Sequence, residues 1–369
     1  MGSKRVAVFY PKTVRAGWSI TSGLAPTLRR MGYEVTDVGT PMAPASDTVP
    51  PQLIDHLKRT FPTLEELKKH DAIIVSGPEH IAPWLDAVYE SLIWKQLDVP
   101  KASMYHESSS RADGGEYRFD LVLWTADHHF YPAIQDAEVY DQEQFAEGRA
   151  HWEPFAVDTE MFKPDEMPEN DMAPLNLKDI PIGFIGSIYD LRASFLNALG
   201  KFEHPPIRIG QVAYQDIDGV NIQRSMEMMA GDIRRMKVFF NLPALSLLNV
   251  GKIVEIMACG TMCLTPQLPT KCGAHRNMTQ FTSGEHLVYY RSGNVAQTAE
   301  TLKYWTREEH AEERERIALA GMKLVHEKYA MTDQLARVLS KLGIKRGIET
   351  KEDCETNEKW LIKMGKISV

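Results

Sequence analysis

Short apolar segments alternate with amphipathic ones along most of this chain. Arg5–Tyr10 and Ala72–Ser76 have the apolar character of buried strands, and the stretches between such segments have helical periodicity. Alternation of this kind implies parallel strands joined by right-handed crossovers, so the sequence predicts an α/β fold. In the first half the expected strands are Arg5–Tyr10, Glu34–Val38, Ala72–Ser76, Lys101–Tyr105 and Phe119–Thr125.

The alternation is interrupted once, between residues 152 and 181, by a polar and Pro-rich segment that is typical of a linker. A chain of 369 residues is long enough for two domains. We therefore predict an N-terminal Rossmann-like domain over residues 1–156, a linker over 157–180 and a C-terminal Rossmann-like domain over 181–330. A C-terminal helix and tail over 331–369 is a candidate to pack back on the first domain. In the second half the expected strands are Ile182–Gly186, Ile207–Ile209, Lys237–Asn241, Thr261–Thr265 and His286–Tyr290.

Charge and composition exclude several classes of protein. The net charge of −8 and the pI of about 5.9 argue against a broad, salt-sensitive grip on nucleic acid, although they leave room for a local basic patch. No apolar run approaches the roughly 20 residues that span a bilayer, so we expect no membrane span. The 4 cysteines fit a reducing compartment, with Cys259 and Cys263 expected as buried thiols. We expect a cytoplasmic protein.

The stretch Lys252–Thr265 is the strongest candidate for a ligand site. It predicts a short helix over Lys252–Cys259, a turn at Gly260 and a strand. A carboxylate at Glu255, inside the helix, can accept hydrogen bonds from two vicinal hydroxyls, as on a ribose. Lys252 lies on a neighbouring helical position, where it can neutralise a phosphate. The alternative is an ordinary helix–turn–strand with a surface ion pair.

A second candidate is Gly183–Arg192, which predicts a strand, a glycine turn and the start of a helix. Gly186 lets the backbone approach a ligand closely, and Ser187 can cap the helix. The free N–H groups at the helix start favour a diphosphate, and Arg192 adds a cation. The alternative is a plain capped helix without a ligand.

Two halves of this kind imply a cleft, with ligands at the carboxyl ends of the strands. Gly17 lies in a loop after the first strand and suits a close approach of the backbone to a ligand. His106 and Glu107 follow the strand Lys101–Tyr105 and are the leading general-base candidates, with Glu79 and His80 next. Adjacent histidines diverge, so the segment 127–129 does not predict a metal site.

Several motifs together resemble the GT-B glycosyltransferases of group 1 that are related to spore-maturation protein CgeB. The resemblance covers roughly residues 100–340. It implies two Rossmann-like domains facing each other across a cleft, with C-terminal helices. It also implies a nucleotide-sugar donor, most often UDP-linked, with no cofactor and no essential metal. The motifs that carry it are Phe155–Pro164, Phe184–Arg192, Lys252–Gly260, Phe281–Tyr290 and Ile317–Val325.

The resemblance assigns roles to individual residues. We predict that the donor is bound by Gly17, Gly186, Ser187, Arg192, Lys252 and Glu255, and that His106 or Glu107 acts on the reacting hydroxyl.

This sequence departs from the family pattern at two positions. Lys252 stands where Arg is usual, and Leu247 stands where many relatives have an acidic residue eight positions before the ribose Glu. Sugar identity and stereochemistry therefore stay open. The hydroxyl acceptor also stays open, and the candidates are a modified DNA base, a glycan or a small molecule. The net charge does not support DNA. A nucleotide-sugar epimerase of the same fold and a catalytically silent binding subunit are the alternatives.

Overall fold

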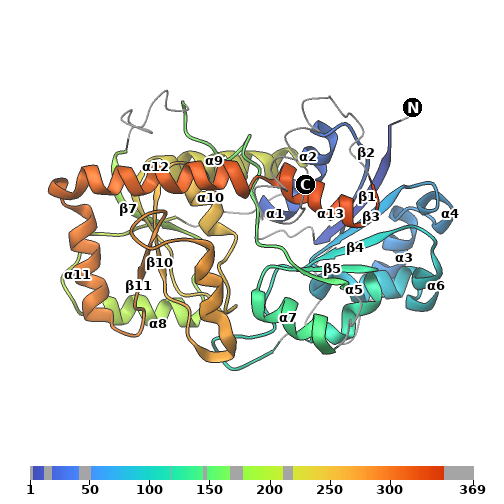
Figure 1. Ribbon diagram of the computed structural model, residues 1–369, viewed down its shortest axis with the longest axis horizontal. Coiled ribbons are helices and arrows are strands. Elements are labelled where there is room, and N and C mark those ends of the chain that lie inside the picture. Colours follow the sequence, from blue (N-terminus) through green and yellow to red (C-terminus); the bar gives the residue numbers. More distant parts are fainter. Residues whose placement is uncertain are drawn as a thin grey trace, which may run out of the picture.

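The computed structural model describes residues 3–11, 19–40, 51–116, 118–143, 148–166, 178–210 and 219–344. These residues form two parallel sheets that occupy opposite halves of the molecule, with helices packed on both (Figure 1). The α/β prediction is confirmed.

The first sheet has the strand order β2-β1-β3-β4-β5-β6, and every neighbouring pair is parallel. Its strands are β1 (Arg5–Pro11), β2 (Glu34–Thr40), β3 (Ala72–Ser76), β4 (Lys101–Met104), β5 (His128–Tyr131) and β6 (Ala150–Trp152). The helices of this half are α1 (Ser19–Ser22), α2 (Leu24–Arg30), α3 (Pro51–Thr60), α4 (Leu64–Leu67), α5 (Pro78–Tyr89), α6 (Ser91–Gln96), the 3-10 helix η1 (Phe119–Thr125) and α7 (Ile134–Glu143).

The second sheet has the order β11-β10-β9-β7-β8 and is also parallel. Its strands are β7 (Ile180–Ile185), β8 (Arg208–Gly210), β9 (Met236–Phe240), β10 (Met262–Pro266) and β11 (Val288–Tyr290). The helices that follow are α8 (Asp190–Leu199), α9 (Gly219–Arg234), α10 (Lys252–Ala258), η2 (Lys271–Gln280), α11 (Val295–Thr306), η3 (Glu308–His310), α12 (Ala311–Lys328) and α13 (Met331–Lys341).

One expected strand is wrong. The segment Phe119–Thr125 is the 3-10 helix η1, and the strand at this place in the sheet is β5, a few residues later. Phe119, Val122 and Thr125 are its buried residues, spaced three apart, which matches the three residues per turn of a 3-10 helix. The Thr125 hydroxyl also donates to the Val122 carbonyl at 2.7 Å. A short apolar run does not by itself distinguish a strand from a tight helix.

In the described ranges, the chain passes between the two halves near residue 157 and again near residue 330, at adjacent points. Val157 pairs with Ala330 in a parallel bridge, and the Val157 carbonyl accepts the Met331 N–H at 2.9 Å. After this crossing, α13 lies beside α2 in the half of the molecule that contains the first sheet (Figure 1). Leu335 and Val338 of α13 share an apolar cluster with β1 and α2. The last described helix therefore belongs to the core of the first half.

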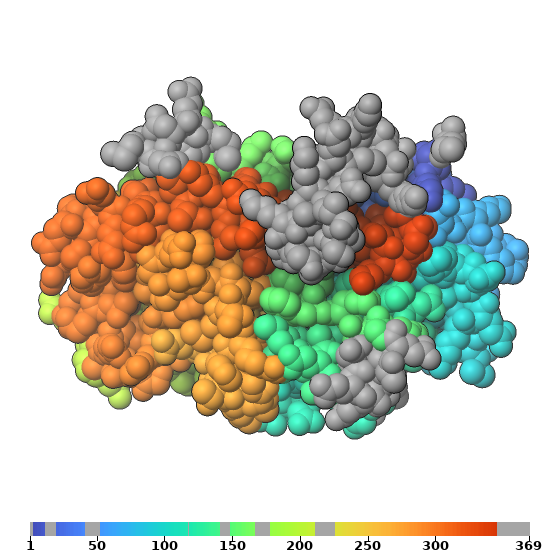
Figure 2. Space-filling model, viewed as in Figure 1, coloured from blue at the N-terminus to red at the C-terminus, as the bar shows by residue number. Residues whose placement is uncertain are grey.

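A second contact joins the halves through α7 and η2. Asn277 of η2 accepts the Ile134 N–H at 2.9 Å and donates to Gln135 at 2.8 Å, while Arg276 pairs with Glu138. Figure 2 shows the orange part of the second half against the green part of the first along this line. The two sheets are thus held at a fixed orientation on one side of the space between them.

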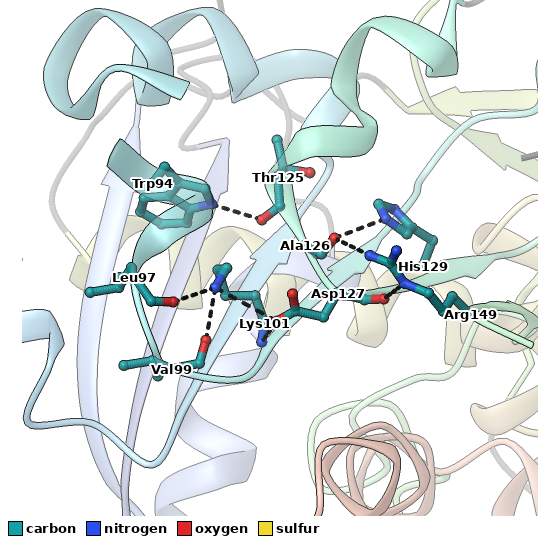
Figure 3. Close-up of polar contacts among 9 residues, drawn as sticks. All are labelled: Trp94, Leu97, Val99, Lys101, Thr125, Ala126, Asp127, His129 and Arg149. Atoms are coloured by element: carbon teal, nitrogen blue, oxygen red, sulfur yellow. Dashed lines mark hydrogen bonds and ion pairs between the residues drawn. The ribbon is translucent and has the colours of Figure 1, made fainter. Parts of the chain in front are cut away.

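The amino ends of β4 and β5 are occupied by structural contacts (Figure 3). The buried Lys101 ammonium donates to the carbonyls of Leu97 at 2.7 Å and Val99 at 3.0 Å. The His129 ring bonds to the Ala126 carbonyl at 3.1 Å, and burial lowers its pKa to about 3, so this ring is uncharged at neutral pH. We therefore expect ligand-binding side chains at the opposite edge of the sheet, where the parallel strands have their carboxyl ends.

Among the described helices, none combines the length and the apolar character needed to traverse a bilayer.

Candidate functional site

A cavity of about 380 Å³ lies between the carboxyl ends of the two sheets. The first half contributes Ile20, Phe155, His106 and Glu107 to its lining. The structure brings together almost all of the predicted site residues, which come from segments far apart in the sequence. The predicted residues that line the cavity are His106, Glu107, Gly186, Ser187, Arg192, Lys252 and Glu255. Gly17 lies outside the described residues.

Glu255 lies on the buried face of α10, and its side chain is 5% exposed. The Lys252 ammonium lies 2.5 Å from Glu255 Oε2 and 2.9 Å from the sulfur of Met229. The helix ends just before Gly260, whose φ of +67° lies in the left-handed region that glycine tolerates. Because removing a carboxylate from water is costly, this pair contributes little net stability to the fold.

Arg192 lies on the first turn of α8 and is partly buried. Its guanidinium donates to the carbonyl of Pro243 at 2.9 Å and of Ser187 at 2.8 Å. It also stacks over the rings of Phe184 and Tyr189, at 5.1 and 4.6 Å from the centroids. Burial lowers the Arg192 pKa, but a guanidinium remains charged in proteins. These described contacts are all to neutral groups, so a fixed positive charge faces the cavity.

Gly186 directly follows β7 and begins the turn between β7 and α8. A Cβ atom at this position would lie 2.9 Å from the Phe184 ring and 3.5 Å from Nη1 of Arg192. A side chain here would therefore press on the residues that hold the guanidinium.

The capping role predicted for Ser187 is wrong. Helix α8 begins at Asp190 with Tyr189 as its N-cap residue, and no side chain makes a capping hydrogen bond there. The turn is longer than the sequence pattern suggested, so Ser187 lies in the loop, where its carbonyl accepts from Arg192.

His106 lies two residues after the end of β4 and is buried. Its Nε2 lies 2.7 Å from the hydroxyl of Ser76, the last residue of β3. Burial lowers the pKa of His106 well below its usual value, and the nearby His80 lowers it further. The imidazole is therefore neutral near pH 7, and the same burial makes it a weaker base than an exposed histidine.

Glu107 reaches across to the second half. Its carboxylate accepts a hydrogen bond from the hydroxyl of Ser246, in the loop after β9. Burial raises the pKa of Glu107, while the Ser246 hydrogen bond and Arg111 oppose that shift. Around this contact the backbones also pair, because Ala112 N–H donates to the Leu245 carbonyl at 2.7 Å.

Ser246 and Tyr189 are site residues that sequence reasoning did not select. Ser246 carries no spacing signal, because its partner Glu107 is 139 residues away. Tyr189 lies inside a motif used for the resemblance, so its position was a usable signal. Leu247, at the unusual position, is buried and lines a neighbouring cavity of about 600 Å³ rather than this one.

The other candidates fall outside the cavity lining. Glu79 and His80 lie on the first turn of α5, behind His106. Asp127 and His129 lie at the opposite edge of the sheet (Figure 3). Within the described part of the chain, no three His, Cys, Asp or Glu side chains are grouped so that they could hold a metal ion.

Comparison with known proteins agrees with this geometry. Residues 192–340 match a family described as glycosyl transferase-like. No curated protein sequence matches the chain.

Solved structures cover nearly the whole chain at low identity. The sucrose-phosphate synthase of Thermosynechococcus elongatus has a TM-score of 0.61 at 13% identity, over 92% of this chain and 99% of that one. An alpha-glucosyltransferase in complex with UDP-glucose and DNA containing an abasic site has a TM-score of 0.60 at 12% identity, over 93% of this chain and 100% of that one. Anabaena HepE in complex with UDP-glucose has a TM-score of 0.58 at 12% identity, over 92% of this chain and 99% of that one. The chain therefore has the GT-B fold of glycosyltransferases, and its residues 192–340 match the glycosyl transferase-like family.

Proposed function

We propose that this protein is a glycosyltransferase that moves a sugar from a UDP-linked donor to a hydroxyl acceptor. One observation carries the proposal. The Glu255–Lys252 pair and the Arg192 guanidinium line the same cavity as His106 and Glu107, so candidate donor-binding and candidate acid–base groups meet there.

The second half supplies the donor site. The buried Glu255 carboxylate accepts hydrogen bonds from the two ribose hydroxyls, and Lys252 beside it serves as a point charge for the diphosphate. Arg192 adds a second cation, fixed by carbonyls and rings before any ligand arrives. Preorganised positive charge stabilises the developing negative charge on the leaving diphosphate. The proposal therefore includes no metal and no other cofactor.

The first half supplies the acceptor side. In the transfer, the bond from the anomeric carbon to the diphosphate oxygen breaks with its electron pair on oxygen. A new bond forms to the acceptor oxygen, whose proton passes to a base. His106, neutral near pH 7, and Glu107 are the candidate bases at the cavity. The rest of the rate enhancement comes from holding both substrates in line.

The similar structures support the choice of donor, since HepE and the alpha-glucosyltransferase are each described with UDP-glucose. The DNA in one of them belongs to that protein. The net charge of −8 does not favour DNA here, and a glycan or a small molecule remains an acceptor class for the test. Neither the epimerase nor the silent-subunit alternative gains support from these comparisons, and the CgeB-related subtype remains a prediction.

Two further assignments belong to the proposal. Residues 1–156 form the acceptor domain and residues 181–330 the donor domain, joined by the linker 157–180 and followed by 331–369, whose described part contains α13. Cys259 and Cys263 are buried as thiols, which suits a reducing compartment, and we propose a cytoplasmic location.

The test is a donor screen followed by an acceptor screen. UDP-glucose at about 100 times its Kd should raise the free energy of unfolding by roughly 2.7 kcal/mol, seen as a higher Tm. UDP release is then measured with acceptor mixtures, with and without EDTA, and products are identified by mass spectrometry. A Tm that no nucleotide or nucleotide-sugar shifts at millimolar concentration would contradict the proposal.

A further inference from the structure

Glu79 makes a pair of contacts that the proposed mechanism does not use. It lies on the first turn of α5, behind the turn that presents His106 and Glu107 to the cavity. Its Oε1 accepts the backbone N–H of His106 at 2.7 Å and that of Glu107 at 3.1 Å. One carboxyl oxygen thus binds two consecutive peptide groups.

Glu79 lies in a buried environment, where its carboxyl group depends on these two hydrogen bonds. Its side chain is 3% exposed, and its second oxygen, Oε2, is buried without a hydrogen-bond partner among the described residues. A buried carboxyl group is costly unless its hydrogen bonds are made. The two backbone N–H groups are therefore the contacts that retain Glu79 in this position.

The start of α5 is also fitted closely against His106. Gly77, the N-cap residue, has a φ of +63°, and a Cβ there would lie 2.8 Å from Nδ1 of His106. Ser76, just before it, holds Nε2 of the same ring at 2.7 Å. The segment from Ser76 to Glu79 thus contacts His106 at its ring and at its backbone.

We infer that Glu79 is a positioning residue for His106 and Glu107 in the proposed sugar transfer. By fixing the two peptide groups, it fixes the directions in which the His106 ring and the Glu107 carboxylate leave the backbone. Glu79 is absent from the cavity lining, so it acts through these two residues and does not touch the substrate. The inference rests on the proposed function.

The protonation of Glu79 gives this role a signature. Its pKa is raised to about 8, chiefly by burial and also by the nearby Glu107 carboxylate, while the backbone hydrogen bonds oppose the shift. An ionised carboxylate accepts hydrogen bonds more strongly than a protonated one. The hydrogen bonds that Glu79 accepts from the His106 and Glu107 backbone therefore strengthen as the pH rises through this range. The titratable groups that face Glu79 are His80, Tyr105, His106, Glu107 and Tyr131.

The experiment compares Glu79→Gln, Glu79→Ala and a control, Asp127→Asn. The control also removes the charge of a carboxyl that accepts a backbone N–H, that of Lys101 at 2.9 Å, but at the opposite edge of the sheet (Figure 3). For each protein we measure Tm, the Kd for UDP-glucose, and kcat and KM for UDP release between pH 6 and 9. Donor hydrolysis suffices for the rate, so no acceptor is needed.

Glu79→Gln keeps an acceptor oxygen and should keep kcat within about threefold, because an amide oxygen still accepts both N–H groups. We expect the wild-type kcat to show an inflection near pH 8, and the kcat of this variant should lack it. Glu79→Ala releases the turn and should lower kcat by about 100-fold, the effect of a misplacement near 1 Å, with KM and Kd little changed. Asp127→Asn should change Tm alone.

Wild-type activity with an unaltered pH profile in Glu79→Gln would overturn the inference, and this variant decides the matter if Glu79→Ala does not fold. A parallel loss of donor affinity and kcat in Glu79→Ala would also overturn it, because that pattern indicates general damage. If the wild type neither binds nor hydrolyses any nucleotide-sugar, the proposed function fails first and the inference with it.

Discussion

The carboxylate of Glu107, after a strand of the first sheet, accepts a hydrogen bond from the hydroxyl of Ser246, after a strand of the second. This contact joins the two halves of the molecule at the edge of the candidate site, and backbone pairing next to it joins Ala112 to Leu245. The position of one candidate base therefore depends on how the other half is placed.

Ser246→Ala should lower turnover by about tenfold, since a hydrogen bond to a charged group contributes roughly 1.5–3 kcal/mol. The Ser246 hydroxyl now opposes the upward shift of the Glu107 pKa, so its loss should raise that pKa further. The pH at which turnover reaches half its maximum should move upward. A pH–rate profile of UDP release checks this, and an unmoved profile would show that Glu107 does not set the rate.

Glu255→Gln should weaken UDP-glucose binding about 10- to 100-fold, because a charge-assisted acceptor for the ribose hydroxyls is replaced by a neutral one. Isothermal titration calorimetry measures the change. Glu313→Gln, whose carboxylate bonds to Tyr304 on an exposed face, is the matched control and should bind normally. If Glu255→Gln binds as the wild type does and is only less stable, Glu255 has a structural role.

Arg192→Lys should also weaken the donor complex, by about tenfold or more, because an ammonium cannot replace the planar guanidinium between two carbonyls and two rings. The matched control is Arg316→Lys, which removes an exposed contact to the Gly284 carbonyl. Both are compared by the Kd for UDP and for UDP-glucose. Equal affinities in the two variants would exclude a diphosphate contact at Arg192.

Gly186→Ala should lower both stability and donor affinity. The added methyl would lie 2.9 Å from the Phe184 ring, and overpacking of this kind typically costs about 1–3 kcal/mol. Gly293→Ala is the control, since a Cβ there meets nothing within 4 Å. Chemical denaturation gives the free energy of unfolding of each. A neutral result at Gly186 would mean that Phe184 moves aside freely.

Glu79→Gln should change how stability depends on pH. The folded-state pKa of Glu79 lies above its unfolded value, so the folded protein binds the proton more tightly. Its contribution is then most favourable at low pH and is lost as pH rises from about 4.5 to about 8. Relative to the wild type, the glutamine variant should gain stability across this window. Urea denaturation at pH 5 and pH 8 measures it, and a constant difference would contradict the raised pKa.

Sequence patterns predicted the local structure of the donor side well. The helix at Lys252–Ala258, its glycine end and the strand after it all form as expected. Such patterns depend on neighbours three or four residues apart, which the sequence displays directly. Where a pattern was ambiguous the prediction failed, as at Phe119–Thr125, which tertiary packing folds into a 3-10 helix. The capping prediction for Ser187 failed for a related reason, because the length of a turn depends on the residues against which the turn packs.

By itself, the sequence determined the α/β alternation and placed candidate site residues after the predicted strands. Only the tertiary structure decided that His106 and Glu107 meet Arg192 and Glu255 in one cavity, and that Glu107 is bonded to Ser246. The physical reason is range. Periodicity and capping act over a few residues, whereas the partner of a buried polar group is chosen by the packing of whole sheets, here across 139 residues of chain.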